Sequence, residues 1–148
     1  MTRAELLGFM RGHEHAVEAS VSASGAPQAA VVGVVVTDRF ELVFDTLAET
    51  RKAANLRRDG RMAFVIGGSG LGDLRTVQYE GVADEPAGEE LAALTTQYLA
   101  RFPDGVTRQS WPGLIYVRVR PTWIRYSDFS VVPPVIIEWT EKELASLA

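Results

Sequence analysis

The chain has 148 residues and a net charge of −4, with 47% hydrophobic and 23% charged residues. This ordinary globular composition predicts one domain over residues 1–148, and the absence of cysteine excludes disulfides and a thiolate nucleophile. Net acidity without a basic stripe argues against nucleic acid as the main partner. No apolar run reaches membrane-spanning length and the first residues lack a signal-peptide pattern, so we expect a cytoplasmic protein.

In the N-terminal half, a short helix precedes several strands. Thr2 and Glu5 form a capping-box pattern, which predicts a helix start. The β-branched run 28–37 is apolar on both faces, as is typical of a central strand, and Gly33 within it indicates the close approach of another group. Gly60 follows a second short helix, where a residue with positive φ is favoured. The predicted elements are a helix over 2–11, strands over 15–22, 28–37 and 41–46, a helix over 50–58 and a strand over 61–67.

In the C-terminal half, one long helix separates the remaining strands. Pro86 opens it, and Leu94 and Tyr98 lie on its apolar face. Pro121 is expected to break the last strand region in two, and Thr140 with Glu143 gives a second capping box. The predicted elements are a strand over 75–83, a helix over 86–102, a loop over 103–112, strands over 114–120 and 122–127 and a helix from 140. Because helices do not alternate with strands, this order favours an α+β barrel over a Rossmann fold.

A cluster of basic residues marks the start of the helix 50–58. Five of the chain's fifteen Lys and Arg residues lie between positions 51 and 61. Thr50 is the expected N-cap, and Arg51 and Lys52 occupy the first turn, where positive charge opposes the helix dipole unless an anion compensates. Free N–H groups and two cations suit a phosphate. From these residues alone, a solvated helix face is an equal alternative.

Several short motifs follow one another along the chain in a characteristic order. They are Asp45-Thr46, Thr50-Arg51-Lys52-Ala53, Asn55-Leu56, Asp59-Gly60-Arg61, the strand 76–81 and the strand region 116–126. Their order and spacing resemble the pyridoxamine 5′-phosphate oxidase family, a set of FMN-binding split barrels. The resemblance runs from about residue 15 to 130, with Thr50 in place of the usual Ser and Asp59-Gly60 in place of Asn-Pro.

The resemblance implies a fold and an activity. The fold would be a six- to seven-stranded antiparallel split β-barrel with peripheral helices, forming a homodimer with FMN at the subunit interface. The function would be that of a flavin-dependent oxidoreductase acting on a small organic substrate. Two alternatives stay open: the deazaflavin F420 on the same barrel, and a non-catalytic flavin-binding protein. The apolar residues expected to be buried in the dimer contact are Trp111, Leu114, Ile115 and Trp123.

The resemblance also supplies the cofactor contacts, although no catalytic residue is identified. The flavin ring would rest on the strand backbones around Gly33 to Val36 and Asp45 to Thr46, and the phosphate on Thr50, Arg51 and Lys52 at the helix start. Thr76 or Gln78 would touch the flavin, unless both simply lie on a half-exposed strand. Gln109 and Ser110 would reach the phosphate from the partner subunit, unless they belong to a polar loop. The implied contacts are Val36, Asp45, Thr46, Thr50, Arg51, Lys52, Thr76, Gln78, Gln109 and Ser110.

Substrate recognition is expected to differ from that of the oxidase itself. The oxidase holds its substrate phosphate with a Lys on the central strand and an Arg-x-His segment in a longer tail. Here Val35 and Val36 are apolar, and the tail 130–148 contains neither Arg nor His. We therefore expect a chain that is not an efficient pyridoxamine 5′-phosphate oxidase.

Two other sequence patterns are not expected to form a metal site or a phosphate-binding loop. His13-Glu14-His15 has no obvious third ligand nearby, so we expect exposed polar residues and no metal. The glycine-rich stretch 67–72 has no Lys and no following helix, which excludes a P-loop.

Overall fold

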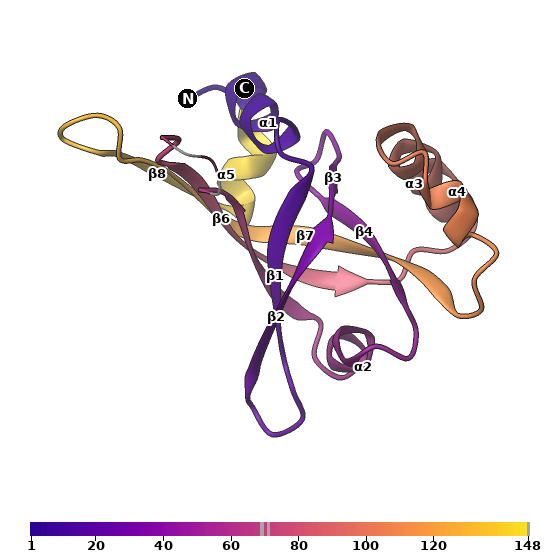
Figure 1. The fold of residues 1–148 in the computed structure, drawn as a ribbon. Coiled ribbons are helices and arrows are strands. Elements are labelled where there is room, and N and C mark those ends of the chain that lie inside the picture. Colours follow the sequence, from indigo (N-terminus) through magenta and orange to yellow (C-terminus); the bar gives the residue numbers. More distant parts are fainter. Residues whose placement is uncertain (69, 71, 148) are drawn as a thin grey trace.

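The computed structural model describes residues 1–68, 70 and 72–147, and its centre is one antiparallel sheet that curls into a split barrel (Figure 1). Along the sheet the strands run in the order β2 (Pro27–Gly33), β1 (His15–Val21), β5 (Arg61–Gly67), β6 (Arg75–Asp84), β7 (Leu114–Asp128), β4 (Leu42–Leu47) and β3 (Val35–Val36). A further strand, β8 (Val135–Thr140), pairs with β7 off this path. The α+β split-barrel prediction is confirmed, and β8 is a strand that the sequence did not indicate.

Helices surround this sheet. They are α1 (Arg3–Arg11), α2 (Arg51–Arg58), α3 (Gly88–Arg101), α4 (Gly105–Arg108) and α5 (Glu141–Ser146). Figure 1 shows α1 and α5 near the two termini at one end of the molecule, α2 at the other end, and α3 with α4 beside β4. Both predicted capping boxes are confirmed, since Thr2 and Thr140 each exchange hydrogen bonds with the Glu three residues on.

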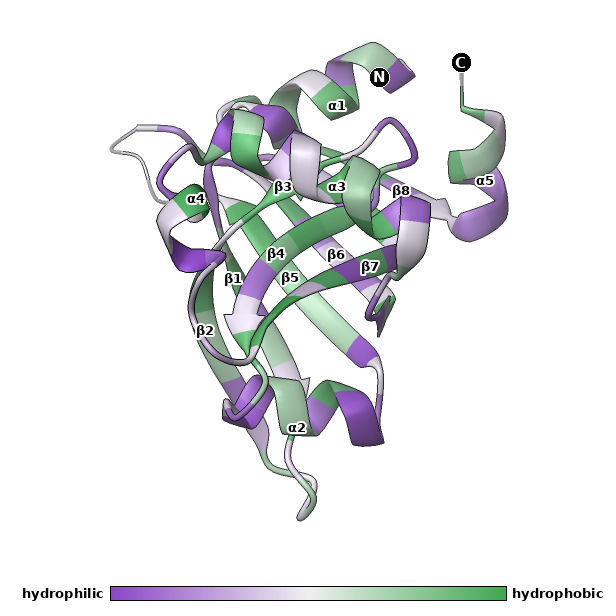
Figure 2. Cartoon of the chain, turned by 90° about the vertical axis from the view of Figure 1, so that its right-hand side faces the viewer, coloured by the Kyte–Doolittle hydropathy of each residue, from purple (hydrophilic) through white to green (hydrophobic). Residues whose placement is uncertain are grey.

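Two apolar clusters hold the strands and helices together. The larger fills the barrel and contains Phe44, Phe64 and Tyr79. The smaller, which contains Val43 and Tyr98, lies between β4 and α3. Successive β4 residues thus face opposite clusters, as a strand requires. Figure 2 shows the hydrophobic colouring that runs along β4 and β5.

The predicted strand over 28–37 is in fact two strands. Val34 separates β2 from β3, and its N–H donates to the Glu14 carbonyl at 2.9 Å. The chain therefore leaves β1 at this point and pairs with β4 instead. The predicted close approach at Gly33 is confirmed, because a Cβ there would lie 3.0 Å from the Phe102 ring.

The predicted break at Pro121 is wrong. β7 runs unbroken through it, because Pro121 lies opposite Gly81 where the β6–β7 register shifts. The register skips Thr122, the unpaired residue of a bulge directly after Pro121, and a bulge is one of the few places where a sheet tolerates proline. The predicted loop 103–112 also contains α4.

The predicted positive φ at Gly60 is wrong too. Helix α2 ends in an extended Asp59 with φ −141°, and Gly60 is outside the positive-φ residues of the described chain. Space explains the glycine instead, since a Cβ there would lie 3.0 Å from the Ala83 carbonyl oxygen.

Candidate functional site

The end of β4 and the start of α2 form one polar corner. The Thr50 hydroxyl donates to the Leu47 carbonyl at 2.9 Å and accepts from the Ala53 N–H at 3.3 Å. Thr46 Oγ1 lies 3.1 Å from Thr50 Oγ1. Thr50 is thus the N-cap that the sequence predicts, and the structure brings Thr46 to it.

The first turn of α2 carries positive charge without an acidic residue of its own. The Arg51 side chain is exposed, whereas Lys52 turns inward and places its Nζ 4.0 Å from Glu18 Oε1. Two later basic residues are paired with acids: Arg57 with Glu85 at 2.6 Å, and Arg61 with Asp59 at 2.7 Å.

A buried polar layer joins α2 to the inner face of β1. The Asn55 side chain donates to Ser20 at 3.1 Å and to Gln28 at 2.9 Å. Glu18 lies in the same layer and is only 2% exposed. Burial raises the pKa of the Glu18 carboxyl, and the Lys52 charge opposes that rise. Sequence analysis missed Glu18, because alternation over 15–22 does not tell which face of the strand is buried.

The Asp45 side chain points away from this corner, toward α3 and α4. Its carboxylate accepts from the Tyr98 hydroxyl at 2.9 Å and from Arg108 Nε at 2.8 Å. Arg108 also donates to Asp104 at 2.5 Å. Burial and the neighbouring Asp45 carboxylate raise the pKa of Tyr98. This Tyr98–Asp45–Arg108 network ties α4 to the barrel and fixes the residues that follow it.

Gln109 and Ser110 directly follow Arg108. The Gln109 N–H bonds to carbonyls of α4, and the Ser110 hydroxyl donates to the Thr107 carbonyl at 3.0 Å. Both side chains belong to exposed residues at the α4 end, beside the Asp45 network.

Val36, another of the implied cofactor contacts, offers backbone groups and no polar side chain. Its side chain is buried in the barrel core, and its carbonyl accepts from Arg11 Nε at 3.0 Å. Val35 beside it packs against the smaller apolar cluster.

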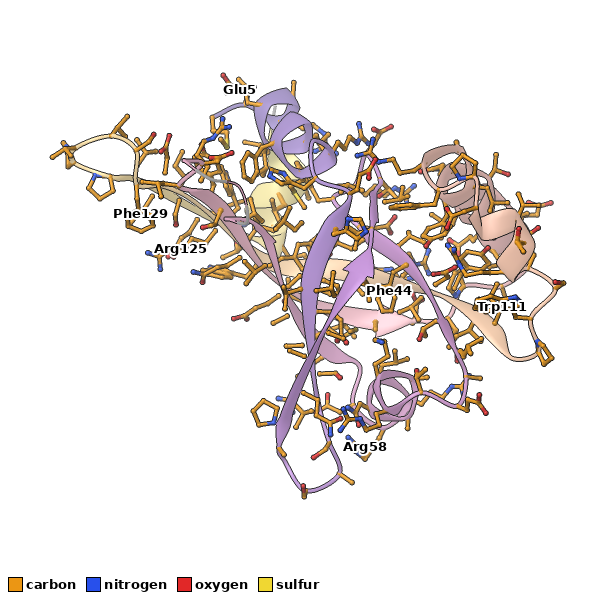
Figure 3. All side chains as sticks on the ribbon, in the orientation of Figure 1. Glu5, Phe44, Arg58, Trp111, Arg125 and Phe129 are labelled. Atoms are coloured by element: carbon orange, nitrogen blue, oxygen red, sulfur yellow. The ribbon has the colours of Figure 1, made fainter. Side chains whose placement is uncertain are left out.

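Thr76 and Gln78 lie far from this corner within one chain. Thr76 pairs with Ser127 of β7, whereas Thr46 pairs with Ile115. Twelve residues of β7 separate these two pairing points, a contour of about 40 Å at the usual rise of a strand. Figure 3 shows Arg125, the partner of Gln78, on the opposite side of the view from Trp111, which follows α4. Within one chain, Thr76 and Gln78 thus pair with the end of β7 opposite to the end that pairs with Thr46.

Gln78 instead lines a shallow apolar hollow on the outer face of the sheet. The hollow has a volume of about 180 Å³ and is also lined by Val17, Val65 and Trp123. Val17 is 44% exposed and Val65 is 43% exposed, which is high for valine on neighbouring strands. This outer face joins β1, β5 and β6.

The described residues hold no group of three or more His, Cys, Asp and Glu side chains that could bind a metal. His13 instead bonds through Nδ1 to the Phe9 carbonyl at 2.9 Å. Ser69 and Leu71, within the glycine-rich stretch, lie outside the described residues. Among the described helices, none has the length and apolar character needed to cross a membrane.

The family profile described as pyridoxamine 5′-phosphate oxidase matches residues 2–128. The chain belongs to the pyridoxamine 5′-phosphate oxidase family. This membership agrees with the split barrel and with the motif order around α2. No curated protein sequence matches the chain.

Solved structures share the fold at low sequence identity. A heme binding protein from Mycobacterium smegmatis has a TM-score of 0.84 and 20% identity over 99% of this chain. This chain spans only 61% of that longer protein. The heme storage protein HutZ from Vibrio cholerae has a TM-score of 0.70 and 17% identity, covering 79% of this chain and 87% of its own.

A third structure is assigned to the same family by its description. It is a Clostridium acetobutylicum protein related to general stress protein 26, of the pyridoxinephosphate oxidase family. Its TM-score is 0.71 at 11% identity, over 96% of both chains. Proteins described as heme-binding and a protein described as an oxidase relative therefore share this fold.

Proposed function

We propose that this chain is a flavin-dependent oxidoreductase that binds FMN, with the phosphate at the start of α2. The observation that carries the proposal is the charge of that helix start: Arg51 is exposed, Lys52 lies beside it, and the first turn has no acidic residue. Positive charge at a helix N-terminus is unfavourable by itself and becomes favourable when an anion binds there.

The residues present fit a phosphorylated cofactor. Thr46 and Thr50 add two hydroxyl groups at the same helix start, and their oxygens lie 3.1 Å from each other. A bound flavin would supply the redox chemistry, while the protein binds and orients it. The chain's own contribution is then the anion site, the strand backbone near Val36 and Asp45, and the polar end of α4.

A homodimer would complete such a site. The β7 contour between the pairing points of Thr76 and Thr46 favours contact of Thr76 and Gln78 with the α2 corner of a second copy of the chain. The exposed Val17 and Val65 give the outer face of the sheet apolar surface that a second copy could bury. We therefore place the cofactor at a subunit interface.

The deazaflavin F420 and a non-catalytic flavin-binding role stay as alternatives, because both would use the same anion site. Heme is a further outcome to test, because two proteins of similar fold are described as heme proteins. The absorption spectrum of the purified protein, with mass analysis of the released cofactor, separates FMN, F420 and heme. Reduction by NAD(P)H, or turnover with oxygen, separates an enzyme from a carrier.

The phosphate site itself is tested with Arg51→Ala/Lys52→Ala. Hydrogen bonds to a charged group contribute roughly 1.5–3 kcal/mol each, so losing both should weaken FMN binding by about two to four decades. The control is Arg57→Ala in the last turn of α2, which removes a cation already paired with Glu85. Equal FMN affinities of the double variant and the control would exclude the α2 start as the phosphate site.

A further inference from the structure

Glu18 differs from the other acidic residues of the described chain because its carboxylate is buried and one carboxylate oxygen has no hydrogen-bond partner. Its side chain is 2% exposed, and Oε1 lies 4.0 Å from Lys52 Nζ. Oε2 has no hydrogen-bond partner among the described residues. A buried carboxylate is costly unless it is paired and hydrogen-bonded, so this group depends on Lys52.

The surroundings of Glu18 contain little other charge. Its neighbours across the sheet are Ala30 of β2 and Phe64 of β5, and α2 supplies Lys52. The polar groups of the same layer are engaged with one another through Asn55. Lys52 is the charged group that acts on the Glu18 carboxyl. Any anion that contacts Lys52 at the start of α2 therefore shares this cation with Glu18.

We propose that Glu18 makes the anion site at the start of α2 selective for phosphate esters that carry one negative charge. This inference rests on the proposed function. With Glu18 ionised, Arg51, Lys52 and Glu18 together carry one positive charge, which a phosphodiester or a singly protonated phosphomonoester balances. A doubly charged monoester brings a second negative charge to the same corner, so its binding is stronger when Glu18 takes up a proton.

The pH dependence follows from the same geometry. Below the raised pKa of Glu18 the carboxyl is neutral, so both cations are available to a doubly charged phosphate. Above that pKa the carboxylate competes for Lys52. The affinity for a monoester should therefore fall as the pH rises, while the affinity for a diester changes less.

The test compares apo wild type with Glu18→Gln, which keeps the size of the side chain and removes its charge. FMN, a monoester, and riboflavin 4′,5′-cyclic phosphate, a diester, are titrated into each protein from about pH 5.5 to about pH 8.5, a range that spans the second ionisation of a phosphate monoester. At the upper end, Glu18→Gln should raise the FMN affinity about tenfold or more, as expected for one unit charge at a partly buried site, and should change the diester affinity much less.

The ionisation of FMN itself is the same in both proteins and cancels from the comparison. Ser20→Ala, an uncharged change in the same polar layer, is the matched control and should not alter the ratio of the two affinities. If Glu18→Gln does not fold, Glu18→Leu removes the carboxylate without needing new partners. Flavin binding with parallel pH profiles in wild type and variant would overturn this inference alone. Failure of both flavins to bind any of the folded proteins would overturn it together with the proposed function.

Discussion

The Asp45 network should contribute more to stability than its position near the surface indicates. Asp45→Asn keeps the shape of the side chain but leaves one oxygen to serve two donors, Tyr98 and Arg108. The side chains of Asp45 and Arg108 are 14% and 22% exposed, so water replaces the lost partner only in part.

The size of the effect follows from these contacts. A hydrogen bond to a charged group contributes about 1.5–3 kcal/mol, and breaking a fully buried ion pair costs about 3–5 kcal/mol. Because Arg108 keeps Asp104 as a second partner, we expect a loss of about 2–3 kcal/mol in the free energy of unfolding, the lower part of that combined range.

Urea unfolding at neutral pH measures this loss, with Asp104→Asn as the matched control. That control makes the same chemical change at the other, 71% exposed partner of Arg108, and should cost clearly less. Hydrogen exchange over residues 105–110 should also become faster in Asp45→Asn, because the network ties α4 to the barrel. If the two variants lose the same stability, the network does not hold α4 and the reasoning is wrong.

Three further outcomes are expected. Glu18→Gln should stabilise the protein at neutral pH, because the folded-state pKa of Glu18 is raised above 4.5. The wild type therefore loses stability as the pH rises from the unfolded-state pKa to the folded-state pKa of this carboxyl. Unfolding measured across this pH range should show that loss in the wild type and not in the variant. Val17→Glu/Val65→Glu should shift a dimer toward monomer in light scattering across a dilution series, whereas Val106→Glu, at an exposed α4 valine, should not; an unchanged mass would remove the outer face from the contact. FMN-loaded protein should oxidise pyridoxamine 5′-phosphate with a kcat/KM below about 10⁴ M⁻¹s⁻¹, and a higher value would show that the apolar Val35 and Val36 positions do not prevent recognition of the substrate phosphate.

The sequence predicted the fold class well because its local signals agree with one another. Both capping boxes, the alternation of the strands and the motif order around α2 all lead to the same barrel. The break at Val34 was not predictable, because the β-branched run is continuous and only the change of pairing partner divides it. The continuity of β7 through Pro121 was missed for a similar reason, since a bulge opposite Gly81 depends on the neighbouring strand.

The candidate site was predictable only where a motif encodes it locally. Thr50, Arg51 and Lys52 lie next to one another in sequence, so their common helix start could be inferred. Glu18 is more than thirty residues away and reaches Lys52 only through the packing of α2 on β1. The role of Arg108 depends likewise on α4, a short helix that the sequence pattern did not indicate.

The position of β7 in the sheet has a consequence for synthesis of the chain. β4 pairs with β7 in a register that joins Leu42 to Val119 and Leu47 to Leu114, so one edge of β4 has no partner until the ribosome has made the last of these residues. Strand pairs of such high sequence separation form slowly. Because β4 carries Leu42, Val43 and Phe44, which are fully buried in the folded protein, the nascent chain exposes an apolar strand edge for about half of its synthesis. We expect this edge to be where a chaperone binds the unfinished protein and where truncated chains aggregate.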